Sequence, residues 1–199
     1  MHFSCKAVAQ CTFVWPVTAD SMDDKGNAQT FGKRKIVNDL DRGFARLHMN
    51  SCAIIENTPV EILYALPRLT ASNPTPSQSG PPSSIGESVL RAAAAIEQTF
   101  GGITANLWDD PFEWTLPEYL ATPQKVKDHL AEVEALRRRA FSSFADDACL
   151  LKHVAVPTGQ TQPLIDLVSE TLRRAEDYQG QALAVFETLS GISPAGFII

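Results

Sequence analysis

The feature that most constrains this chain is a set of long segments in which apolar residues recur every three or four positions. The clearest covers residues 162–190 and is followed by Gly191, a residue type that commonly ends helices. Its apolar face consists of Leu164, Val168, Thr171 or Leu172, Ala175, Tyr178, Ala182, Phe186 and Leu189. Almost no segment shows the alternation that is typical of strands. The pattern therefore predicts an all-α fold.

Two further helices are marked by capping residues. The first spans 85–105 and follows Ser84, which stands three residues before a Glu, the spacing of a capping box. The second begins after Thr122 with Pro123 at its first position and continues to Phe144. Both segments carry an apolar stripe, so each is expected to bury one face.

The beginning of the chain lacks such a stripe. Residues 1–48 show no sustained period and are interrupted by Gly and Pro, so we expect a poorly ordered N-terminal extension. The first helix is then predicted over 58–71, where Thr58 provides a cap and Pro59 suits the first turn. The folded domain would span 49–199 and tolerate deletion of the extension. Whether residues 1–48 belong to the native protein stays open.

Three short features stand between or within the helices. The segment Trp108–Trp114 concentrates aromatic and acidic residues, which indicates either a lid over one end of the helices or a ligand or partner contact. Arg137–Arg139 are interpreted as cations at the negative end of the third helix. Lys152–Val156 is the one candidate strand.

Composition limits the function classes. A net charge of -6 and a pI of about 5.2 disfavour nucleic-acid binding, which requires a basic surface. No apolar run approaches the ~18 residues of a membrane span. The four Cys show no CxxC spacing and are expected to be free thiols, and the first residues make a poor secretory signal. We therefore expect a cytoplasmic protein with neither nucleic acid nor membrane as a partner.

Two stretches resemble the DinB/YfiT-like family. Residues 84–97, SIGESVLRAAAAIE, are similar to the element that opens the second family helix. Residues 164–191 are similar to the last family helix, including its x-Gly-Gln tripeptide, here Gln179-Gly180-Gln181. The resemblance covers about two thirds of the chain. It implies an up-down-down-up four-helix bundle that is commonly a homodimer.

In that family three His residues bind a divalent metal, often Ni or Zn, between the second and fourth helices. The corresponding positions of this chain are Arg91, Arg174 and Tyr178. A guanidinium group is permanently cationic and has no lone pair to donate to a metal. The four His of the chain show no ligand spacing either. We therefore expect a degenerate member without a metal cofactor.

Each Arg in this proposed cleft has a Glu four residues earlier on its helix. Glu87 precedes Arg91 and Glu170 precedes Arg174, the favoured order for an ion pair on one helix turn. These groups would form either a structural polar network or a site for a small anionic ligand. The favoured function is a binding or scaffold protein. The alternative is a thiol-dependent transferase or isomerase that uses bacillithiol, mycothiol or glutathione, as some relatives do.

Overall fold

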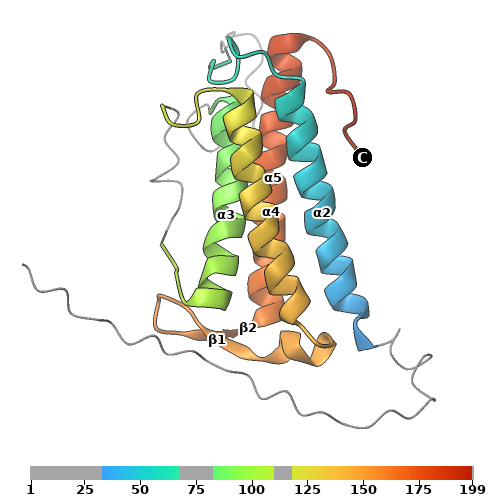
Figure 1. The fold of residues 1–199 in the computed structure, drawn as a ribbon, viewed down its shortest axis with the longest axis vertical. Helices are drawn as coiled ribbons and strands as arrows, with labels where there is room; N and C mark the ends of the chain where they lie inside the picture. Colours follow the sequence, from blue (N-terminus) through green and yellow to red (C-terminus); the bar gives the residue numbers. More distant parts are fainter. Residues whose placement is uncertain (1–32, 68–82, 110–117, 199) are drawn as a thin grey trace, which may run out of the picture.

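Four long helices make up most of the described chain. The computed structural model describes residues 33–67, 83–109 and 118–198. The helices lie side by side (Figure 1), and they are α2 (Lys35–Glu56), α3 (Ile85–Ala105), α4 (Pro123–Ser143) and α5 (Leu164–Ser190). Between α4 and α5 stand a short 3-10 helix, η2 (Asp147–Leu151), and two strands, β1 (His153–Ala155) and β2 (Thr161–Pro163). The expectation of an all-α protein is confirmed.

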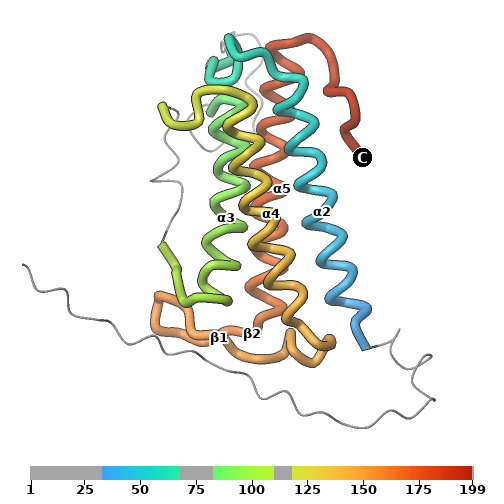
Figure 2. Tube along the Cα trace, in the orientation of Figure 1, coloured from blue at the N-terminus to red at the C-terminus, as the bar shows by residue number. Residues whose placement is uncertain are grey.

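The helices point in two opposite directions (Figure 2). α2 and α5 run one way, and α3 and α4 run the other way. α3 packs most extensively against α5 and also contacts α4, while α2 packs against both α5 and α4. α2 and α3 touch each other little, so they face each other diagonally across the core.

Aromatic rings from three helices meet in the core. The ring centroids of Phe44 on α2, Phe100 on α3 and Phe141 on α4 lie 5.3 to 5.8 Å apart in edge-on or tilted arrangements. Such pairs contribute about 0.5–1.5 kcal/mol beyond the area they bury. On α3, the four consecutive residues Ala92–Ala95 are buried, and their small side chains let neighbouring helices approach closely. Within the described ranges, no helix is both long and apolar enough to cross a membrane.

The two central helices begin and end as their capping residues predict. The Ser84 hydroxyl accepts a hydrogen bond from the backbone N–H of Glu87 at 3.2 Å, and α3 covers the predicted 85–105. The Thr122 hydroxyl accepts one from the N–H of Lys125 at 3.3 Å, with Pro following at the first position of α4. α5 ends at Gly191, whose φ of 74° is left-handed.

The prediction for the first helix is wrong. The first described helix is α2, which starts inside the segment predicted to be poorly ordered and contains the predicted boundary after residue 48. Residues 58–67 form turns, and the other residues predicted for that helix, 68–71, lie outside the described residues, as do 1–32. Thr58 belongs to the end of α2, because its hydroxyl donates to the carbonyl of Ile54 at 2.7 Å. The Thr-Pro pair therefore follows a helix instead of starting one.

Sequence periodicity missed α2 for two physical reasons. The N-cap residue of α2, Arg34, makes no side-chain capping hydrogen bond. Asp147 of η2 caps the helix instead. The Asp147 carboxylate accepts hydrogen bonds from the backbone N–H groups of Ile36 at 3.1 Å and Val37 at 2.9 Å. The buried face of α2 also contains polar residues, notably Asn50, which interrupt the apolar pattern.

Two segments outside the long helices, the hairpin and the residues after α5, form hydrogen bonds that fix their positions. The predicted strand at Lys152–Val156 is confirmed as β1, which pairs antiparallel with β2, and this hairpin lies at the end of the molecule where α5 begins (Figure 1). At the other end, the segment after α5 returns along α2. The buried Asn50 amide donates to the carbonyl of Ile198 and accepts from its N–H, both at 2.9 Å.

Candidate functional site

The predicted pair on α3 forms. The guanidinium of Arg91 donates to the Glu87 carboxylate at 3.0 Å from one terminal nitrogen and at 3.4 Å from Nε. Both side chains are about one third exposed. An exposed pair at this spacing contributes about 0.3–0.5 kcal/mol.

The pairing on α5 differs from the predicted one. The Glu170 carboxylate accepts from Arg173 at 3.0 Å, and Arg173 also donates to Asp177 at 2.7 Å. Consecutive residues on a helix are rotated by about 100°, so Arg173 lies on the exposed face with these acids and Arg174 turns toward α3. The Nε–H of Arg174 is buried and has no hydrogen-bond acceptor among the described residues. Leaving such a donor unsatisfied costs about 1–3 kcal/mol.

A direct contact between α3 and α5 gives the positions of Arg91, Arg174 and Tyr178 along the helix axes. The hydroxyls of Thr99 and Thr171 lie 2.7 Å apart and are buried. With a rise of about 1.5 Å per residue in antiparallel helices, Arg91 and Tyr178 both stand about 10–12 Å from this contact. Arg174 stands only about 4.5 Å from it. Tyr178 is half-buried against the core. Convergence of all three side chains on one cleft stays a prediction.

A pocket of about 340 Å³ lies beside Arg174, between α3, α5 and the hairpin segment 156–162. We call it the hairpin pocket. The lining residues that matter below are Gln98, Trp108, Gln162, Leu167, Glu170 and Arg174. Its volume falls in the usual range for small-molecule sites, about 300–1,000 Å³. The pocket therefore has room for a small ligand next to a cationic side chain whose Nε–H has no acceptor among the described residues.

The wall formed by Trp108 is held in place by several local contacts. Asn106 takes a left-handed φ of 54° that turns the chain sharply after α3, and its side-chain oxygen accepts from the Trp108 indole N–H at 3.1 Å. The side-chain amide of Gln98 donates to the Trp108 carbonyl at 3.0 Å. The ring rests on Gly102, where a Cβ would lie 2.4 Å from ring atoms. Trp108 thus covers the end of α3, and residues 110–114 of the predicted lid lie outside the described residues.

Two residues that line the hairpin pocket, Thr99 and Thr171, are held by hydrogen bonds. The Thr171 hydroxyl donates to the carbonyl of Leu167 at 2.8 Å, so its single proton is already used. The Thr99 hydroxyl must then be the donor in the contact between the two threonines. This hydrogen bond joins α3 to α5 one turn from Arg174 and fixes two residues of the pocket lining relative to each other.

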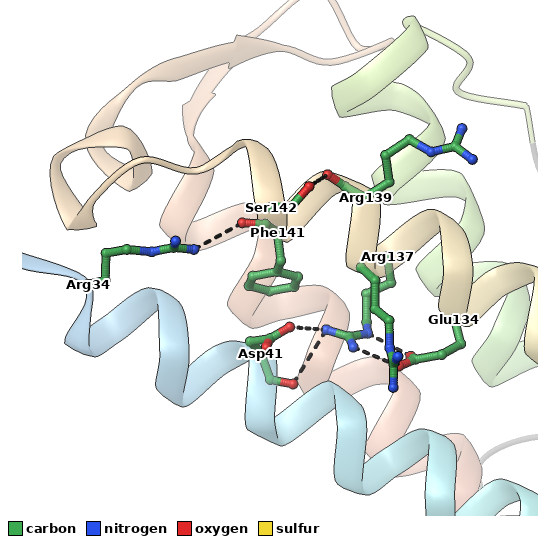
Figure 3. Close-up of polar contacts among 8 residues, drawn as sticks. Arg34, Asp41, Glu134, Arg137, Arg139, Phe141 and Ser142 are labelled. Carbon is green, nitrogen blue, oxygen red and sulfur yellow. Dashed lines mark hydrogen bonds and ion pairs between the residues drawn. The ribbon is translucent and has the colours of Figure 1, made fainter.

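A second polar group is buried between α2 and α4 (Figure 3). Arg137 is 2% exposed, donates to both Glu134 oxygens at 2.7 and 2.8 Å, and reaches the carboxylate of Asp41 on α2. Arg138 donates to the same Glu134 at 2.7 Å. We call Asp41, Glu134, Arg137 and Arg138 the Arg137 network.

The Arg137 network corrects the interpretation of Arg137–Arg139 as a helix cap. α4 continues to Ser143, and its last turn contains no basic residue. Burial raises the pKa of Glu134, but the hydrogen bonds from Arg137 and Arg138 outweigh burial and leave that pKa below its ordinary value of 4.5. The spacing of three and four residues from Glu to the two Arg was the available sequence signal.

The described His and Cys residues near the Arg137 network are poorly suited to catalysis. Cys52 lies 3.7 Å from the His48 ring nitrogen, one turn away on α2. Burial, and then the charge of Glu56, raise the pKa of the Cys52 thiol, so the nucleophilic thiolate is disfavoured. Burial also lowers the pKa of His48, assisted by the charges of the nearby arginines.

One further contact between helices was not foreseen. His129 on α4 and Glu97 on α3 approach to 3.8 Å through a nitrogen and an oxygen that are both buried and lack hydrogen-bond partners among the described residues. Burial raises the pKa of Glu97, partly offset by His129. Two groups are too few for a metal site, and no group of three or more His, Cys, Asp or Glu in the described ranges is placed to hold an ion.

Comparison with known proteins gives no match: no family model, no curated protein and no solved structure is similar to the chain at a significant level. The resemblance to the DinB/YfiT-like family therefore rests on the residues quoted above.

Proposed function

We propose that this chain is a metal-free, DinB/YfiT-like four-helix bundle that works as a binding protein, with the hairpin pocket as its ligand site. α2 and α5 run in one direction and α3 and α4 in the other, which supports the up-down-down-up topology that the resemblance implies. The tripeptide Gln179-Gly180-Gln181 supports it too. The buried Gln179 amide donates to the Leu47 carbonyl at 2.6 Å and to the Ser51 hydroxyl at 2.7 Å, which joins α5 to α2.

The residues at the family's metal positions do not fit a metal ion. Arg91 and Arg174 offer only N–H donors, and Tyr178 offers a single phenol oxygen. Two fixed positive charges would also repel a divalent cation. We therefore propose no metal-dependent step for this chain.

The observation that carries the proposed binding function is the hairpin pocket itself. It combines a volume suited to a small molecule, an aromatic wall that is fixed by local contacts, and an Arg whose buried Nε–H has no acceptor among the described residues. Sites with one convergent charged group in a partly apolar lining are typical of small-molecule binding.

Two measurements on the purified full-length chain test this proposal. Elemental analysis should find no stoichiometric transition metal, and a thermal-shift screen of small molecules should find ligands that raise the melting temperature without added Ni or Zn. Stoichiometric Ni or Zn, together with turnover of a thiol such as bacillithiol, would instead support the alternative of a thiol-dependent transferase or isomerase.

We also propose a homodimer in the cytoplasm, as the resemblance implies. Met49 on α2 is half exposed, as are several other large apolar side chains on the surface. A second copy could cover such a face with two-fold symmetry. Sedimentation velocity at about 10–50 µM, a range chosen for a stable interface, should show a dimer, and a monomer would contradict this part of the proposal.

A further inference from the structure

Among the described residues, the charges that line the hairpin pocket leave one cation without a counter-charge. Arg174 has no salt-bridge partner within the described ranges, and its Nε–H is buried there without an acceptor. Glu170 also lines the pocket, but its carboxylate is engaged by Arg173 at 3.0 Å. Within the described part of the chain, the pocket therefore presents one positive charge that no acidic side chain neutralises.

This balance favours a ligand with a single negative charge. A carboxylate can accept two hydrogen bonds from one guanidinium group. A phosphate would bring a second negative charge close to Glu170, and the described lining contains no second basic side chain to compensate for it.

The remaining lining favours a flat apolar group attached to that carboxylate. The partly buried Trp108 forms one wall, and Leu167 contributes an aliphatic surface from α5. An aromatic ring of a ligand can stack on an indole in offset or edge-on geometry. The wall is ready to receive it, because Gln98 and Gly102 already fix the position of Trp108.

We infer that the hairpin pocket binds small aryl monocarboxylates, with Arg174 holding the carboxylate and Trp108 contacting the ring. This inference rests on the proposed binding function and specifies its ligand class.

The test uses the ¹⁵N-labelled full-length chain and the indole N–H resonance of Trp108, assigned with W108F. Phenylacetate is titrated against phenylacetamide, which has the same shape without the charge, and against inorganic phosphate. Phenylacetate should shift the Trp108 resonance in a saturable way, and the other two probes should bind at least about tenfold more weakly.

Two matched variants identify the cation. R174Q should weaken phenylacetate binding by about tenfold to a hundredfold, the range for losing a charged hydrogen-bond partner. R42Q removes the same charge from a side chain that is 76% exposed on α2, which contributes no residue to the pocket lining, and it should change binding less than about twofold. Far-UV circular dichroism and a cooperative urea transition verify that each variant is folded.

Several outcomes would overturn the inference. Equal binding of phenylacetamide would show that the charge is not recognised, and equal binding of phosphate would refute the monocarboxylate. Equal losses in R174Q and R42Q would refute the role of Arg174. An absence of phenylacetate binding would also overturn it. If other compounds from the thermal-shift screen still shift Trp108, the proposed binding function stands and only the ligand class fails.

Discussion

Replacement of Glu134 by Gln should destabilise the protein strongly through the Arg137 network. Glu134 is 8% exposed and accepts three hydrogen bonds, two from the buried Arg137 and one from Arg138. E134Q keeps the shape of the side chain but leaves Arg137 with Asp41 as its remaining acidic partner. Breaking a buried ion pair costs about 3–5 kcal/mol, and the remaining partner places the expected loss near about 3 kcal/mol.

The matched control is R138Q, which removes the exposed partner of the same carboxylate. The Arg138 side chain is 73% exposed, so its loss should cost less than about 1 kcal/mol. Urea unfolding followed by circular dichroism gives both free energies. In a thermal melt, E134Q should lower the midpoint by about 6–12 °C, at about 2–4 °C per kcal/mol for a chain of this size.

The effect of E134Q should also depend on pH. Because the pKa of Glu134 is lowered in the folded protein, its ionised form contributes stability above the ordinary pKa of 4.5 and loses it as the pH falls through the folded value. The difference between wild type and E134Q should therefore shrink below about pH 4.5. A loss for E134Q below 1 kcal/mol, or one equal to that of R138Q, would refute the assignment of Arg137 as a buried cation that depends on Glu134.

Three further predictions concern other parts of the molecule. Deleting residues 1–48 removes buried Phe44 and Leu47 together with residues 35–48 of α2, nearly two thirds of that helix, so the fragment 49–199 should lose its cooperative urea transition. A fragment as stable as the full chain would contradict the packing of α2. G102A should cost about 1–3 kcal/mol and change the Trp fluorescence, since the added Cβ meets the Trp108 ring, whereas G180A, with nothing within 4 Å, should be neutral or stabilising; equal effects would refute the contact. The triple variant R91H/R174H/Y178H should gain affinity for Ni or Zn in a metal titration, while each single variant should not, and a folded triple variant without such affinity would refute the residue correspondence.

The parts of the fold that sequence predicted correctly depend on neighbouring residues. Ser84 and Thr122 cap helices through bonds to N–H groups three residues away, and Gly191 ends α5 through its own φ. α2 could not be found in this way, because its cap is Asp147, more than a hundred residues further along the chain. Its buried Asn50 is likewise satisfied by Ile198, which local periodicity cannot reveal.

The candidate site likewise contains residues that the local sequence identified and residues that depend on contacts distant in the sequence. The resemblance pointed to Arg174, and the aromatic cluster pointed to Trp108, but the wall contributed by the hairpin depends on the pairing of residues 153–155 with 161–163. β1 was predicted, but β2 was not, because residues 161–163 carry too little local signal to be identified as a strand without their partner. Arg137 was misinterpreted because charge runs are usually exposed, and only the packing of α4 against α2 buries it.

The distant cap of α2 has a consequence for how the chain folds during synthesis. A single helix of this length is marginal in water without tertiary contacts. The first N–H groups of α2 have no side-chain acceptor until Asp147 has left the ribosome, and the Asn50 amide has no backbone partner until Ile198 follows. α2 is therefore made first among the four long helices of the described chain but should be stabilised late, and its apolar face stays available to chaperones until the segments up to Ile198 have been made.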